Sequence, residues 1–84
     1  MESRISVLAI LVQDRDATGP VNHLLHEYGD CIIGRMGIPY REKQVNIMSI
    51  AVDAPQDVIS AMSGKIGKLS GVCSKTAYTG GSRG

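Results

Sequence analysis

The sequence predicts an α+β domain with the ferredoxin-like βαββαβ sandwich, a four-stranded antiparallel sheet with two helices on one face. Three observations lead to this fold class. The chain of 84 residues has the length of one domain. Apolar residues recur with strand or helix spacing in the order strand, helix, strand, strand, helix, strand. Each half is then one β-α-β unit, and right-handed crossovers place both helices on the same face.

The first strand is expected from Arg4 to Val12, and both of its faces are apolar. Such a strand is typical of a central position that is covered on both sides. In the turn that follows, Asp16 is expected to cap the first helix, and Pro20 is tolerated in its first turn. That helix runs to about Tyr28 with one apolar stripe, which consists of Ala17, Val21, Leu24, Leu25 and Tyr28. Gly29 should end it, because glycine accepts a left-handed conformation without strain.

The segment from Cys31 to Val52 predicts a hairpin in the middle of the chain. Its two β-rich runs are separated by the polar stretch from Pro39 to Lys43. The second run is apolar on both faces, like the first strand, yet the helices can cover only one face of the sheet. The other face would expose a large apolar patch, which usually marks an interface. We therefore expect a homo-oligomer, either a dimer or a tetramer, whose sheets or sheet edges meet.

Asp53 is expected to cap the second helix, with Gln56 completing a capping box and Pro55 in the first turn. Its inward stripe consists of Val58, Ile59, Met62, Ile66 and Leu69. Gly64 and Gly67 each weaken its second half by about 1 kcal/mol relative to Ala. These glycines predict either a close packing contact or an early end of the helix.

The last strand is expected from Val72 to Tyr78, so that residues 4–78 form one domain. Residues 79–84 have no apolar content and are predicted to be a flexible tail. Phe and Trp are absent, so the core must be aliphatic and filled by Met. Cys31 and Cys73 belong to no CxxC pair, and we expect two buried, reduced thiols.

The charge and hydropathy of the chain exclude several classes of partner. A net charge of +1 is too small to indicate direct binding of nucleic acid or of an anionic membrane. The first strand is apolar for only about eight residues and has no cleavage signal after it, so neither a signal peptide nor a membrane-spanning helix is expected. We therefore expect a cytoplasmic protein.

Two groups near the first helix have the residue types of a binding site. His23 and His26 have a spacing that can hold a metal, but no third ligand is apparent, so we predict two exposed histidines and no metal. Asp14 and Asp16 could bind a small polar ligand, because the loop after a first strand commonly carries function. A helix cap with flanking charges is the favoured interpretation of this loop.

Arg35, Tyr40, Arg41 and Lys43 form the basic cluster of the predicted hairpin. A guanidinium matches a carboxylate or a phosphate bidentately, so the cluster could bind a small anion. A solvated hairpin tip that keeps the sheet edge soluble explains the same residues equally well. As candidate ligand-binding residues we take this cluster together with the two aspartates of the first loop, and we predict that the hairpin is the recognition surface.

Several functions of this fold class are excluded by missing residues. An RNA-recognition domain needs aromatic residues on its central strands, whereas the expected strands offer only Tyr78. A metallochaperone needs a CxxC in the first loop, which here reads DRDATG. An acylphosphatase needs a glycine-rich anion cradle, and Arg15 lies between two aspartates that would repel an anion. The serines lack a GxSxG setting, so no serine nucleophile is expected.

Four segments resemble the iron-only hydrogenase system regulator family, and together they cover most of residues 4–78. They read VNHLLHEYGD, IIGRMGIPYREK, VDAPQDVISAMSGKIGKLSGV and KTAY, and GRMGIPYR is the most specific part. That family is similar in fold to ACT domains and to the ligand-binding domain of the nickel-responsive regulator. The resemblance implies a small cytoplasmic protein linked to the maturation or control of iron-only hydrogenase.

Two departures limit what the resemblance implies about binding sites. ACT domains often have a Pro-Gly pair at the start of helix one, whereas this chain has Gly19 followed by Pro20. The nickel ligands of the nickel-responsive regulator are replaced here by Arg35, Met36 and Gly37 and by Val45 and Asn46. We therefore expect a regulator without cofactor or metal that binds a small anionic ligand or a regulatory partner protein. The alternative is a small oligomeric ferredoxin-like enzyme with a cleft over the sheet.

Overall fold

The computed structural model describes residues 2–78 and has the α+β fold class that the sequence predicts. The predicted tail at residues 79–84 lies outside this range. The strands are β1 (Arg4–Val12), β2 (Ile32–Tyr40), β3 (Val45–Ala54) and β4 (Val72–Tyr78), and the helices are α1 (Thr18–Glu27) and α2 (Gln56–Gly67). Short 3-10 turns, η1 (Arg15–Ala17), η2 (Gly29–Cys31) and η3 (Arg41–Lys43), complete the connections.

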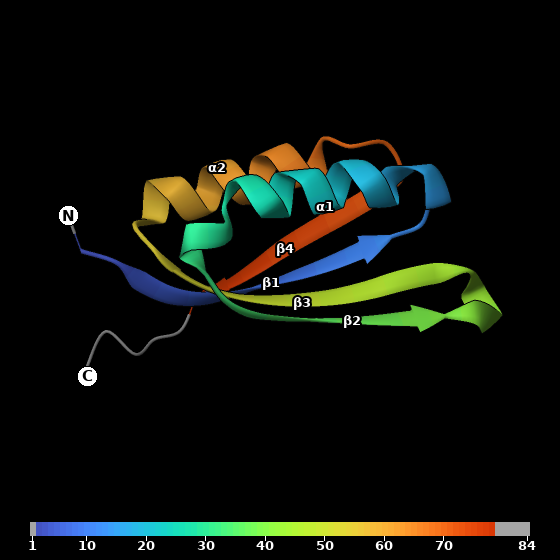
Figure 1. Ribbon diagram of the computed structural model, residues 1–84, viewed down its shortest axis with the longest axis horizontal. Coiled ribbons are helices and arrows are strands. Elements are labelled where there is room, and N and C mark those ends of the chain that lie inside the picture. Colours follow the sequence, from blue (N-terminus) through green and yellow to red (C-terminus); the bar gives the residue numbers. More distant parts are fainter. Residues whose placement is uncertain (1, 79–84) are drawn as a thin grey trace.

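The four strands form an antiparallel sheet in the order β2-β3-β1-β4, and both helices cover one of its faces (Figure 1). β1 and β3 are therefore the central strands, and β2 and β4 are the edges. This order follows from two β-α-β units with right-handed crossovers. The start of α1 and the turn between β2 and β3 lie at the same end of the molecule (Figure 1).

The core lies between the helices and the alternate residues of β1 and β3 that face them. Leu8 and Ile50 are fully buried on the sheet side, and Val21, Ile59 and Met62 are fully buried on the helices. All buried apolar side chains of the described residues are aliphatic or Met, as the composition predicts. The helical stripes are confirmed in their central positions, whereas Leu24, Tyr28, Val58 and Leu69 pack at the margin.

Two predicted helix caps are wrong. Asp14, not Asp16, makes the first capping bond, and its carboxylate accepts from the backbone N–H of Asp16 at 2.9 Å. Asp53 lies inside β3 and caps nothing, because the strand pairing with β1 continues to Ala54. α1 ends at Glu27 with Tyr28 as its C-cap, close to the predicted end, but Gly29 begins the turn η2 and does not take the left-handed conformation expected of it.

β2 continues through Pro39 to Tyr40, so the first two residues of the polar loop predicted from the sequence belong to the strand. Proline is tolerated there because β2 is an edge strand and its outer side needs no ladder hydrogen bond. The turn closes with Gln44 in the left-handed conformation at φ 56°. The register shifts between Ile32 and Gly34, which leaves Ile33 as an extra residue in the ladder.

The face of the sheet away from the helices, here called the open face, is largely apolar. It follows from the strand register, and its members are Ile5, Val7, Ala9, Leu11, Gly34, Met36, Ile38, Tyr40, Val45, Ile47, Ser49, Ala51, Asp53, Cys73, Lys75 and Ala77. Ile5 and Met36 are 53% and 56% exposed. Cys73 is also exposed and Cys31 is half-buried, so the prediction of two buried thiols is wrong, although both are free.

Candidate functional site

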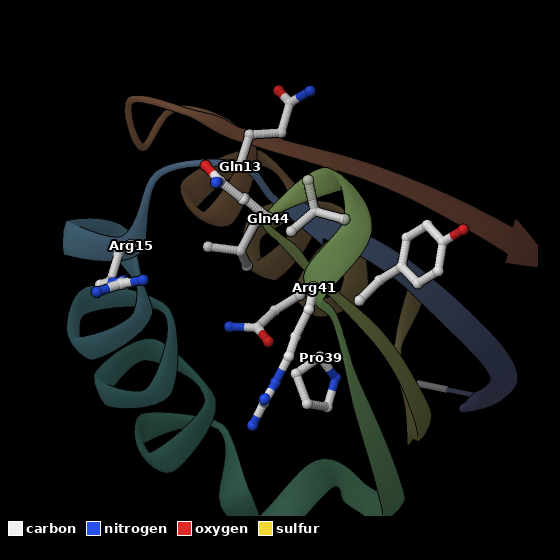
Figure 2. Close-up of a pocket in the computed structure, with 9 residues that line it drawn as sticks. Gln13, Arg15, Pro39, Arg41 and Gln44 are labelled. Carbon is white, nitrogen blue, oxygen red and sulfur yellow. The ribbon is translucent and has the colours of Figure 1, made fainter.

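A cavity of about 580 Å³ lies at the end of the sheet where α1 begins. Three segments contribute to it, namely the end of β1 with the following turn η1, the end of β2 with the turn η3, and the start of β3. Its lining residues are Val12, Gln13, Arg15, Pro39, Tyr40, Arg41, Gln44, Val45 and Asn46. We call this space the hairpin cavity (Figure 2).

One row of paired strand residues forms the floor of the hairpin cavity. Val12 pairs with Asn46 between β1 and β3, and Asn46 pairs with Pro39 between β3 and β2. Paired residues of adjacent strands point to the same face of a sheet. Val12 is buried on the helix side, so this row lies on the core face of the sheet. The cavity thus has an apolar floor with one amide side chain in it.

Two guanidinium groups border the cavity from opposite sides. Figure 2 shows Arg15 on the turn before α1 and Arg41 with Pro39 on the hairpin. Both arginines are exposed, and neither makes an ion pair with any residue between positions 2 and 78. The amides of Gln13, Gln44 and Asn46 add further donors and acceptors. The lining therefore carries two positive charges and no carboxylate.

The backbone around Arg15 is held by several short contacts. The backbone N–H of Gln13 donates to the carbonyl of Gly71 at 2.7 Å, and that of Ala17 donates to the carbonyl of Asp14 at 2.9 Å. Gly71 has φ +76° and leaves no room for a side chain beside Asp14. The turn that presents Arg15 is thus tied to the start of β4, which makes its position well defined.

The turn that presents Arg41 is closed by its own backbone. The N–H of Gln44 donates to the carbonyl of Arg41 at 3.1 Å. A hydrogen bond with Glu42 raises the pKa of the Tyr40 hydroxyl above its ordinary value of 10.0. Arg41 has no ion pair with Glu42 or with any other residue from 2 to 78, so its guanidinium is available to the cavity.

The sequence of the chain matches a family over residues 4–76, described as "TM1266-like: Iron-only hydrogenase system regulator, putative". The chain belongs to this family. Among solved structures it is similar to the uncharacterized protein TM1266 from Thermotoga maritima, with 38% sequence identity and a TM-score of 0.88. That match covers 92% of this chain and 98% of the other. No curated protein matches the chain. The family named from the segments quoted above is therefore confirmed.

The predicted site residues of this TM1266-like chain separate into two groups. Tyr40 and Arg41 line the hairpin cavity, whereas Lys43, Asp14 and Asp16 lie outside its lining. Arg35 is also outside it, because its guanidinium donates to the Asn22 side chain of α1 at 2.8 Å.

Four polar residues of the lining are not predicted from the sequence as parts of one site, namely Gln13, Arg15, Gln44 and Asn46. Arg15 lies between two aspartates in the sequence, which argues against an anion site there. The expected pairing of the first and third strands could have identified them, because it brings the loop after the first strand close to the start of the third strand.

The histidines of α1 behave as an exposed pair. His23 lies 3.4 Å from the carboxylate of Glu27, one turn further along the same helix. Among residues 2–78 no group of three or more His, Cys, Asp or Glu side chains is arranged to hold a metal ion. No helix in the described part of this TM1266-like chain is long and apolar enough to cross a membrane.

Proposed function

We propose that this chain is a non-enzymatic regulatory module of the iron-only hydrogenase system that binds a small anionic ligand in the hairpin cavity. The observation that supports this proposal is that Arg15 and Arg41, neither of which is ion-paired within residues 2–78, border one cavity whose lining has no carboxylate. The link to the iron-only hydrogenase system rests on the description of the family, and the proposed binding of an anion rests on the cavity.

The chemistry of the lining favours a phosphate or a carboxylate. Guanidinium groups offer planar, paired donors that match the oxygens of both anions, and such charge-assisted bonds are about twice as strong as neutral ones. The three amide side chains can donate to further oxygens of the same ligand. The volume of about 580 Å³ suits a metabolite of ordinary size.

The same lining supports binding rather than catalysis. Apart from Tyr40, its side chains carry no group that exchanges a proton in the accessible pH range, and the pKa of Tyr40 is raised further from neutrality. A general acid or base works best with a pKa near the operating pH. This proposal keeps the cytoplasmic location expected from the sequence.

The position of the cavity suggests how ligand binding would affect a partner protein. Arg15 follows β1, whereas Arg41 lies on the projecting β2–β3 turn. An anion held by both guanidiniums would tie the turn to the start of α1. A partner that contacts the hairpin would then meet a different surface in the liganded and the free protein, which is a population shift between two arrangements of one turn.

The experiment is an NMR titration of the ¹⁵N-labelled protein with sodium phosphate, with sodium chloride added to hold the ionic strength constant. Phosphate should shift the Nε–Hε signals of Arg15 and Arg41. Arg41→Gln and Arg15→Gln should each weaken phosphate binding by about tenfold or more, since hydrogen bonds to charged groups contribute about 1.5–3 kcal/mol. Lys43→Gln is the matched control, because it removes one positive charge from the same turn but not from the lining.

Two results would contradict the proposal. The first is the absence of phosphate-dependent shifts at both arginines. The second is an equal loss of binding in Lys43→Gln and Arg41→Gln, because this would reveal attraction by net charge alone and no defined site.

A further inference from the structure

We infer that the open face is covered by a second copy of this chain, in a two-fold dimer whose sheets pack face to face. The inference does not depend on the ligand of the hairpin cavity. Three observations support a dimer: the composition of the open face, the arrangement of large and small residues on this face, and the area of the face.

The open face exposes apolar side chains from all four strands. Ile5, Met36, Ile38 and Ile47 are between 43% and 56% exposed there. β2 contributes most, through the exposed side chains of Met36, Ile38 and Tyr40. Burial of apolar surface is worth roughly 25 cal/mol per Å², so a partner that covered this face would gain stability from it.

The charges on the open face argue against several other occupants. Asp53 and Lys75 are its charged members, one near the end of β3 and the other on the edge strand β4. They are opposite in sign and lie at the margin. A nucleic acid or an anionic membrane would need a positive field over the face, which is absent.

The strand register arranges the side chains of the open face in rows. Leu11, Ile47 and Ile38 form a row of large residues, and Val7, Ala51 and Gly34 form a row of smaller ones. Between them lies the row of Lys75, Ala9, Ser49 and Met36. A two-fold axis that runs across the strands through this middle row places each large row over the small row of the other copy.

In the two outer rows this arrangement matches large residues of one copy with small residues of the other. On the axis, Met36 meets Met36 of the other copy, and Lys75 meets its counterpart at the edge strand. Ile47 would lie over Ala51 of the other copy, and Ile38 would lie over Gly34. Large residues facing small ones let two layers interdigitate at the density of a protein core. A two-fold interface uses the same patch on both copies, so one sequence supplies both halves of the match.

The area of the open face determines how stable a dimer we expect. Four strands about 4.8 Å apart carry the sixteen positions of the open face, spaced about 6.8 Å along each strand, and give a face of roughly 500 Å². Two such faces bury about 1,000 Å² in total, which is the lower limit for a specific interface. We therefore expect a reversible dimer that dissociates on dilution.

Sedimentation velocity of the full chain tests the inference, with Ala9→Glu and Ala61→Glu as a matched pair. Both alanines are exposed, the first in the middle row of the open face and the second on α2. Ala9 is paired with Lys75, so the new carboxylate faces an opposite charge and the isolated fold should tolerate it. In the dimer the same carboxylate would be buried between two sheets.

The wild type and Ala61→Glu should approach twice 8.9 kDa as the concentration rises from the micromolar to the millimolar range. Ala9→Glu should keep its circular dichroism spectrum and remain at the monomer mass over the same range. A wild type that stays monomeric at millimolar concentration overturns the inference. Dimers of equal strength in both variants also overturn it, because another surface would then mediate the association.

Discussion

Asp14 packs directly against the backbone of Gly71, so that a Cβ on Gly71 would overlap the Cβ of Asp14. Gly71 also has φ +76°, a conformation in which side chains are strained. This contact joins the turn after β1 to the start of β4. Because Arg15 follows Asp14, the contact also determines where one wall of the hairpin cavity lies.

Gly71→Ala should lower the free energy of unfolding by about 2 kcal/mol, because the new side chain is strained in the left-handed backbone conformation and overlaps Asp14. Urea denaturation followed by circular dichroism measures this change. Gly64→Ala is the control, since nothing lies within 4 Å of a Cβ at this position of α2. It should raise the free energy of unfolding by about 1 kcal/mol. Equal effects of the two substitutions would contradict the special role of Gly71.

Ser6→Ala should raise the free energy of unfolding by about 1 kcal/mol, because a buried hydroxyl without a partner keeps its desolvation cost. Ser6 is fully buried, and its Oγ has no hydrogen-bond partner among residues 2–78. Ser74→Ala is the comparison, since the hydroxyl of Ser74 lies 3.0 Å from that of Ser63. This variant should lose about 1 kcal/mol in the same urea experiment. A loss of stability in Ser6→Ala would disprove the account of the buried hydroxyl.

The double variant His23→Ala, His26→Ala should change the free energy of unfolding by no more than about 0.5 kcal/mol. Both side chains are exposed, and the contact of His23 with Glu27 is a surface pair on one helix. Thermal and urea unfolding of the variant and the wild type measure the change. A loss of several kcal/mol, or a stoichiometric metal in the purified wild type, would show that α1 holds a metal site.

Glu42→Gln should lower the pKa of Tyr40, since the hydrogen bond with Glu42 is the main cause that raises it. A raised pKa means that the folded protein favours the protonated phenol. The associated stabilisation is present below the pKa of the unfolded chain and is lost as the pH rises through the higher folded value. NMR titration of the Tyr40 ring in both proteins checks the shift. An unchanged titration would show that the bond with Glu42 does not form in solution.

The order of strands and helices and the aliphatic core are predictable from the sequence alone. Both follow from the period of apolar residues, which is a local property of the chain. Val21 and Leu25 are buried one turn apart on α1, and Ile59, Met62 and Ile66 are buried on α2 at the same helical spacing. The apolar character of both faces of β1 and β3 could also be predicted, because successive strand residues point to opposite faces.

The helix caps and the composition of the candidate site depend on contacts between distant parts of the chain. Asp53 has the spacing of a helix cap, but strand pairing with β1 keeps it in β3. Arg35 and Arg41 belong to one cluster in the sequence, yet Asn22 holds the first and the hairpin cavity receives the second. Arg15 and Arg41 approach the same cavity because Val12 pairs with Asn46, far along the chain. Such long-range pairing brings together side chains whose proximity no local pattern encodes.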